Sequence, residues 1–495
     1  MPSRSLLLVA LAVASVATAR AQNWLEVRSS HFTVVSNAGE AEARTAAVQF
    51  ERMHSVFREV FPESDLNPGN PIVVLAVEDK ATFQSLEPES YLSKGQLDIT
   101  GLFLRTPEKN YVLVWLNAPV AHPIAPVYHE YTHLILSRRG WLPLWLNEGW
   151  AEYYQNTQIL RDEVRLGMAS AENLFLLRRN QLLPLTTVFA VDSNSPYYHE
   201  QEKGSIFYAE SWALTYYLQI KDREEKTHRL QDYLELVNRK VDAVAAATQA
   251  FGDLAKLQAK LQKFIVDGEY GYLRLPAPAD ADISPFTVRT LSRAQADAAR
   301  ADFYASSNRE SSARALLTQV LRDDPGNISA RETLGSIAFR QQSYDEARKW
   351  YEEAVQLGSQ SFLAYYSLAA VALNKKLPDM QARADVENYL QTAIKLNPLF
   401  APAYECMGSL LAVRGRNFEE AHQWLLKAIQ LDPGNADFRL NDARILLRMN
   451  RANDAAAALE AALNMAHTPE QTAAIQDALQ RTPGYVALRG APPHH

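Results

Sequence analysis

The chain has 495 residues, of which 47% are hydrophobic and 22% charged, and a net charge of −7. A length of this order predicts two or three domains, each large enough for its own core. Acidic and basic residues are interspersed without a basic stripe, which argues against a nucleic-acid-binding surface. Cys406 is the only cysteine, which excludes an intrachain disulfide.

The first 21 residues have the features of an export signal. Arg4 gives a positive start, residues 6–16 form a short apolar run, and Ala19 to Ala21 offer a small-x-small cleavage site. The run is too short for a membrane span, and no later stretch reaches about 18 apolar residues. We therefore expect a signal peptide at 1–21 that is cleaved after Ala21, no membrane span, and a periplasmic or secreted mature protein.

Residues 22–118 combine short apolar runs with one helical pattern. Strands are predicted at Phe32–Val35, Ile72–Val77 and Tyr111–Leu116, which are rich in β-branched and aromatic residues. A helix is predicted at Glu40–Val60, between the first two strands. Gly101–Thr106 is a further segment that can serve as an edge strand. We expect a small twisted sheet against which the next helix packs.

The strongest chemical signal is the stretch His129-Glu130-Tyr131-Thr132-His133, in a region, 119–272, that is predicted to be helical. On a helix, residues at i and i+4 share one face, so both imidazoles can reach one tetrahedral metal. Glu130 flanks that site and can take a proton from the water that the metal activates. The alternative is a chance spacing of two interior histidines. Apolar neighbours disfavour it, because buried polar groups need a partner.

A second helix is predicted after Pro143 and offers the third ligand. Glu148 and Glu152 stand one turn apart on one face of it. Glu148 can complete a zinc site with the two histidines, while Glu152 lies behind it and hydrogen-bonds a ligand histidine. The alternative is a pair of exposed glutamates, but Trp145 and Trp150 leave this helix little exposed surface.

The string Leu144-Trp145-Leu146-Asn147-Glu148-Gly149-Trp150-Ala151 resembles the segment that follows H-E-x-x-H in the aminopeptidase N family of the thermolysin-like gluzincins. The resemblance implies that His129, His133 and Glu148 bind Zn²⁺, that Glu130 is catalytic and that Glu152 orients a histidine. Here 14 residues separate His133 from Glu148, fewer than in those aminopeptidases. Such a short link is usual in the smaller bacterial families of this group.

A helix beginning at Tyr208 is similar to the family's Y-x-K-G-x-x-L helix, whose tyrosine donates a hydrogen bond to the tetrahedral oxyanion. The resemblance therefore assigns this catalytic role to Tyr208, although Glu210 and Ser211 replace the lysine and glycine; an interior tyrosine is the alternative. His199 is a second candidate for oxyanion or substrate contact. The glutamate with which the aminopeptidases hold the substrate amine is absent from Gly101–Thr106, so endopeptidase-like specificity is expected rather than aminopeptidase action.

Residues 273–290 contain three prolines and predict a linker. The remainder, 291–495, is periodic. Its equivalent positions, separated by 34, 39, 35 and 34 residues, are Val320, Ala354, Ala393, Ala428 and Ala462. A period of 34 resembles tetratricopeptide repeats, which form an all-α solenoid whose concave face binds peptides or partner proteins. A generic helical bundle is the alternative.

Together these patterns predict an α+β fold. A thermolysin-like metallopeptidase lobe, made of a small mixed sheet (22–118) and a helical zinc-site part (119–272), precedes an all-α tetratricopeptide solenoid. We predict an exported Zn²⁺-dependent peptidase that hydrolyses a peptide or protein substrate, with repeats that bind substrate or a protein partner. The alternative is a catalytically inactive peptidase-like protein that acts as a repeat-based binding or scaffold protein. The presence of Glu130 favours the enzyme.

Overall fold

The computed structural model describes residues 23–61, 71–88, 100–106, 109–119, 124–136, 142–192, 195, 197, 201–239, 241–278, 286–374, 380–415, 417–466, 468–483 and 485. The expected signal peptide, His199 and the expected end of the motif helix at 137–140 lie outside these residues. No helix among those described combines the length and the apolarity that a membrane crossing needs.

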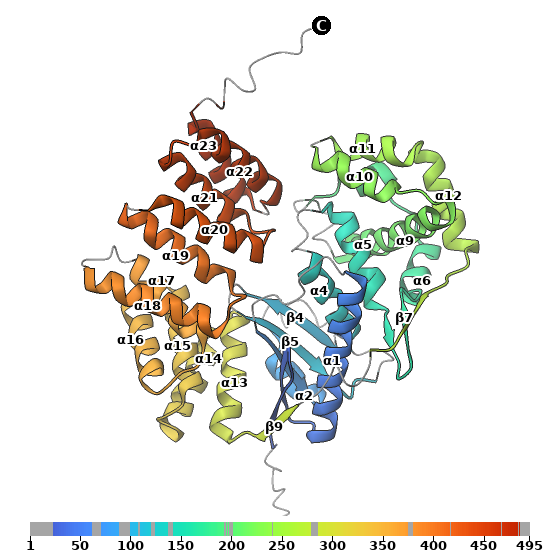
Figure 1. The fold of residues 1–495 in the computed structure, drawn as a ribbon. Coiled ribbons are helices and arrows are strands. Elements are labelled where there is room, and N and C mark those ends of the chain that lie inside the picture. Colours follow the sequence, from blue (N-terminus) through green and yellow to red (C-terminus); the bar gives the residue numbers. More distant parts are fainter. Residues whose placement is uncertain are drawn as a thin grey trace, which may run out of the picture.

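A mixed sheet of six described strands lies at the centre of the molecule (Figure 1), in the order β4-β5-β3-β2-β1-β9. The strands are β1 (Leu25–Arg28), β2 (Phe32–Ser36), β3 (Ile72–Val77), β4 (Gly101–Arg105), β5 (Asn110–Trp115) and β9 (Thr287–Thr290). β2, β3 and β5 run parallel, whereas β4, β1 and β9 pair antiparallel with their neighbours. The predicted small mixed sheet is confirmed, and β4 occupies an edge of it.

The sheet is apolar on both faces. Successive side chains of a strand point to opposite sides, so Val34 and Val74 join one cluster and Val35 and Leu75 join another. The first cluster contains α1 (Glu40–Val60), the helix predicted between the first two strands, together with the motif helix. Strands of this kind need a cover on both faces, and the second cover must come from elsewhere in the chain.

The second face is covered by α2 (Lys80–Leu86) and by α13 (Arg293–Ser306), the first helix of the repeat region. Tyr111 of β5 packs edge-to-face against Phe303 of α13, with ring centroids 5.8 Å apart. Lys109 Nζ and the Tyr111 hydroxyl each donate a hydrogen bond of 2.8 Å to Asp302 Oδ2 of α13. The repeat region is therefore joined to the sheet by apolar packing and by a largely buried ion pair.

The segment 273–290, predicted as a linker, contains two strands, each of which pairs with a strand elsewhere in the chain. β8 (Leu273–Pro276) pairs antiparallel with β7 (Glu163–Leu166), and β9 pairs antiparallel with β1. Residues 279–285 lie outside the described residues. Strands of four residues with a mixed polar pattern become stable only beside a neighbour, so the sequence of this segment alone does not reveal them. The two parts of the chain are thus connected by structure at both ends of the segment.

Helices dominate the part that follows the motif helix (Figure 1). They are α5 (Leu144–Gln155), α6 (Ala171–Arg179), α7 (Leu185–Ala190), α9 (Gln201–Glu225), α10 (Arg229–Asn238), α11 (Ala243–Phe251) and α12 (Leu254–Asp267). The prediction of helix throughout this part is wrong at β6 (Gln158–Ile159) and β7, which form a second small sheet with β8.

Helix pairs fill the C-terminal part and stack beside the sheet, from yellow to red in Figure 1. After α13 they are α14 (Glu310–Asp323), α15 (Ile328–Arg340), α16 (Tyr344–Gln356), α17 (Phe362–Asn374), α18 (Met380–Leu396), α19 (Ala401–Arg414), α20 (Phe418–Leu431), α21 (Ala436–Arg448), α22 (Ala452–Met465) and α23 (Pro469–Arg481). The equivalent positions Val320, Ala354, Ala393, Ala428 and Ala462 are all buried, each on the second helix of a pair. An added Cβ at Gly335 would lie 2.9 Å from the ring of Tyr351. The predicted repeat of helix pairs is confirmed.

Candidate metal centre

The motif helix, α4 (Ala125–Leu136), is anchored on the side that faces α1. Gln49 Nε2 of α1 donates a hydrogen bond of 2.6 Å to the Tyr128 hydroxyl, and His54 Nδ1 lies 2.7 Å from the Tyr131 hydroxyl. Because 3.6 residues make one turn, the histidines at 129 and 133 lie on the opposite face. The contacts with α1 therefore leave these two rings directed at α5.

Helix α5 begins after Pro143 and packs closely on α9. An added Cβ at Gly149 would lie 2.1 Å from Thr215 Oγ1 and 2.6 Å from the carbonyl oxygen of Ser211. Only glycine permits this approach, because no flexible side chain could move far enough to relieve both contacts. The close packing buries the neighbouring Glu148, which is only 3% exposed, and fixes it beside α4.

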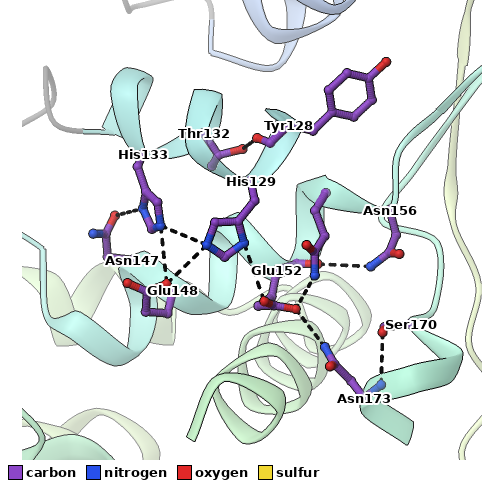
Figure 2. A network of polar contacts seen from close by, with 11 residues as sticks. Tyr128, His129, Thr132, His133, Asn147, Glu148, Glu152, Asn156, Ser170 and Asn173 are labelled. Atoms are coloured by element: carbon purple, nitrogen blue, oxygen red, sulfur yellow. Dashed lines mark hydrogen bonds and ion pairs between the residues drawn. The ribbon is translucent and has the colours of Figure 1, made fainter. Parts of the chain in front are cut away.

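The three predicted ligands meet in a compact triangle (Figure 2). His129 Nε2 lies 3.1 Å from His133 Nε2 and 3.4 Å from Glu148 Oε2, and His133 Nε2 lies 3.3 Å from the same oxygen. Zinc bonds of about 2.0–2.2 Å at tetrahedral angles place neighbouring ligand atoms about 3.3–3.6 Å apart. The triangle fits one face of such a tetrahedron to within a few tenths of an ångström.

The composition of the cluster also fits zinc. Two imidazole nitrogens and one carboxylate oxygen are donors of the kind found at catalytic zinc, which usually has three protein ligands. Among the residues that the structure describes, no second group of three or more histidine, cysteine, aspartate or glutamate side chains converges in this way. The sequence prediction of ligands His129, His133 and Glu148 agrees with this geometry.

The clustered side chains perturb the pKa values of His129 and Glu148 strongly. Burial disfavours the charged form of His129, but the hydrogen bond to Glu148 and the charges of Glu152, Glu148 and Glu130 outweigh it and raise its pKa to about 9. Burial would raise the pKa of Glu148, but hydrogen bonds and charge from His129 and His133 lower it to about 2. Glu148 is thus a carboxylate that could ligate a metal directly, whereas His129 would have to lose a proton to do so.

Each ligand histidine has a partner for its second ring nitrogen on α5 (Figure 2). Glu152 Oε1 lies 3.5 Å from His129 Nδ1, an ion-pair contact longer than an ordinary hydrogen bond, and Asn147 Oδ1 lies 3.2 Å from His133 Nδ1. Such partners hold the tautomer and the orientation of a ligand ring. Asn147 was not predicted, although it immediately precedes Glu148 and a neutral acceptor at that place is a usable signal.

Glu130 follows His129 on α4 and is half-buried. Within the described part of the chain, no residue forms a hydrogen bond or an ion pair with its carboxylate. A carboxylate that is not held by protein donors keeps its lone pairs for a proton on a bound water, as a general base requires.

Tyr208 lies on α9, half-buried beside Phe207. It is one turn before Ser211, whose carbonyl oxygen faces Gly149. The helix that carries Tyr208 thus touches α5 one residue from the ligand Glu148.

Glu210 stands where the gluzincin helix that this segment resembles has lysine. It is fully buried and accepts a hydrogen bond of 2.7 Å from the backbone N–H of Leu183. Burial raises the pKa of this carboxyl to about 8, despite that hydrogen bond. The side chain therefore has a structural contact that the family lysine could not make.

Two segments of the chain match known families. A family described as tetratricopeptide repeat matches residues 296–362, and a family described as protein of unknown function (DUF1570) matches residues 123–239. The second match spans α4, α5 and most of the helical part around the candidate site. A curated relative, the protein O-mannosyl-transferase Tmtc3 of Drosophila melanogaster, is 25% identical over 153 residues, which are 31% of this chain and 16% of the fly protein.

Similar solved structures are repeat proteins. YrrB, described as a TPR protein with an unusual peptide-binding site, is 22% identical and covers 37% of this chain and 92% of its own, with a TM-score of 0.32. A thermophilic TPR protein of Thermus thermophilus, TTC0263, is 21% identical and covers 38% and 99%, with a TM-score of 0.32. The C-terminal helix pairs contain tetratricopeptide repeats, which indicates protein partners. None of these matches is to a gluzincin peptidase.

Proposed function

We propose that this chain is a zinc-dependent peptidase with a tetratricopeptide-repeat domain. The observation that carries the proposal is the triangle of His129 Nε2, His133 Nε2 and Glu148 Oε2, whose edges of 3.1–3.4 Å suit a tetrahedral zinc. Zinc bound there would supply a Lewis acid that polarises a substrate carbonyl and makes water a stronger acid. The resemblance of the two helices to a gluzincin site supports the same assignment.

The chain's own side chains have separable roles in this proposal. Glu130 takes a proton from the attacking water and returns it to the nitrogen of the leaving group. Tyr208 donates a hydrogen bond from its phenol to the oxygen that becomes negative in the tetrahedral intermediate. Glu152 and Asn147 keep the ligand rings oriented and do not touch the substrate.

The edge strand β4 offers a place for the substrate backbone. Trp115 donates a hydrogen bond of 2.9 Å to the carbonyl of Thr100, and Thr106 donates one of 3.1 Å to the carbonyl of Lys109. In an antiparallel ladder the intervening residues point their backbone groups the other way, so those of 101 and 103 face away from β5. Because β4 packs against α4, an extended peptide on this edge would lie beside the motif helix.

Specificity follows from the residues of β4. The strand, Gly101–Arg105, has no carboxylate with which to hold a free amino terminus. We therefore propose endopeptidase-like action within longer chains. We also propose export to the periplasm or beyond it, on the signal features at 1–21.

A second proposal is a repeat-based binding or scaffold protein whose metal-site lobe has no turnover. The comparisons support this one more directly, because the repeats are matched and the family over α4 and α5 has no known function. The two proposals differ in Glu130: a scaffold has no use for a carboxylate placed to act as a base, whereas a peptidase requires it.

The test combines zinc content with cleavage of an unbiased peptide library. The wild type, Glu130→Gln and the control Glu235→Gln, on the exposed side of α10, are compared. The peptidase proposal expects equal zinc in all three and cleavage by all but Glu130→Gln. Zinc without cleavage in the wild type would support the scaffold. Retention of zinc by His133→Ala would refute the metal site itself.

A further inference from the structure

A second layer of side chains surrounds Glu152, the carboxylate behind His129 (Figure 2). Asn173 Nδ2 donates a hydrogen bond of 2.9 Å to Glu152 Oε2, and Gln155 Nε2 donates to the same oxygen. The other oxygen, Oε1, lies 3.5 Å from His129 Nδ1. The carboxylate is thus divided in function: one oxygen is bound by two amides and the other faces the ligand ring.

Asn173 is itself firmly placed. It belongs to the first turn of α6, where the Ser170 hydroxyl caps the helix by accepting a hydrogen bond of 3.1 Å from the Asn173 backbone N–H. A capped first turn fixes the backbone from which the side-chain amide extends. Asn173 lies 21 positions from Glu152, on a different helix, so its amide ties α6 to the metal site.

Neutral donors suit this position. A cation beside Glu152 would compete with His129 for the negative charge, whereas an amide N–H stabilises the carboxylate and leaves its charge available to the imidazole. Without these donors, a carboxylate that is only 12% exposed could rotate away from the ring. Such a rotation would release the His129 ring from the orientation that presents Nε2 to the metal.

We propose that Asn173, together with Gln155, is a positioning residue of the zinc site: it acts through Glu152 on His129. The inference rests on the metal site of the proposed function and extends it to a helix outside the recognised motifs. It assigns a role in zinc affinity to a residue that touches neither the metal ligands nor the substrate.

The test is a double-mutant cycle read as zinc affinity, measured by competition with a chromophoric chelator. Asn173→Ala should weaken zinc binding about tenfold, the effect of losing one hydrogen bond to a charged group, and Glu152→Ala should weaken it about 10- to 100-fold. In the Glu152→Ala background, Asn173→Ala should change the affinity no further, because its route to His129 is gone. The control Asn180→Ala, at the exposed C-terminal end of α6, should bind zinc as the wild type does.

Three outcomes would overturn the inference. If Asn173→Ala binds zinc with wild-type affinity, Glu152 orients His129 without the hydrogen bond from Asn173. An equal loss with and without Glu152 would show that Asn173 acts only by supporting the fold, which a thermal melt of the metal-free variants checks independently. Absence of zinc binding by the wild type would refute the proposed metal site, and the inference with it, and is distinguishable from the first two.

Discussion

Zinc binding to this site should compete with a proton on His129. The pKa of that ring is raised to about 9, because hydrogen bonding to Glu148 and nearby carboxylates outweigh its burial. At pH 7 the metal-free ring is therefore about 99% protonated, and zinc must displace that proton at a cost of about a hundredfold in affinity. Zinc affinity should increase about tenfold per pH unit from pH 7 until it levels off near pH 9.

Calorimetric titrations in buffers of different ionisation enthalpy measure this proton directly. About one proton per zinc should be released at pH 7, and fewer as the pH approaches 9. Glu152→Gln is the matched variant, since the charge of Glu152 helps to raise the pKa of His129; it should release less proton at pH 7. A zinc affinity that is independent of pH, with no proton release, would refute the reasoning.

The raised pKa of His129 also predicts that the metal-free and the zinc-bound protein change in stability in opposite directions as the pH rises. A histidine whose pKa is raised on folding stabilises the metal-free protein fully below its unfolded pKa of about 6.5, and this contribution is lost as the pH rises through about 9. The metal-free protein should therefore lose stability between these values. With zinc in fixed excess, binding should add stability over the same range.

Three other predictions concern packing and buried charge. Gly149→Ala should lower the free energy of unfolding by about 1–3 kcal/mol and weaken zinc binding, because a Cβ 2.1 Å from Thr215 Oγ1 must push α9 from α5; unchanged chemical denaturation and zinc affinity would contradict this. Glu210→Gln should stabilise the protein by about 2–3 kcal/mol at pH 7. The pKa of the Glu210 carboxyl is about 8 in the folded protein, so this group destabilises the fold as the pH rises from about 4.5, and glutamine removes that effect. A gain in stability that persists at pH 4 would contradict this cause. Asp302→Ala should lower the free energy of unfolding by about 2–3 kcal/mol, because it leaves Lys109 without its carboxylate at the junction of the sheet and the repeats. If the double variant Asp302→Ala/Lys109→Met loses as much stability or more, the ion pair is not the reason.

Local periodicity was sufficient to single out the three residues that we propose as metal ligands. The spacing of His129 and His133 places both on one helical face in any helix, and Glu148 follows on the next helix after a short connection. The same holds for the repeat positions such as Ala354 and Ala428, since a period of 34 residues reflects one helix pair regardless of what it contacts. These features depend on neighbours within a turn or a unit, and the structure places them accordingly.

Contacts between distant segments were not predictable in this way. Arg289 of β9 donates to both carboxylate oxygens of Glu26 in β1, at 2.8 and 3.0 Å, although 263 positions separate them. Asn173 meets Glu152 only because α6 and α5 both pack on α9. A polar residue in a surface-type sequence pattern can pair with many different partners, so the sequence does not indicate which one it meets.

The sequence by itself determined most of the helices and the central strands with their apolar faces, the three residues that we propose as zinc ligands, and the period of the repeats, because each follows from spacing along one or two elements. The tertiary structure decided that the first repeat helix covers the second face of the sheet, so that the expected linker ends in paired strands. The physical reason is that an apolar sheet face must be covered by some other element, but its sequence does not specify which element covers it. Its choice depends on chain topology and on shape, which only the folded arrangement of all elements supplies.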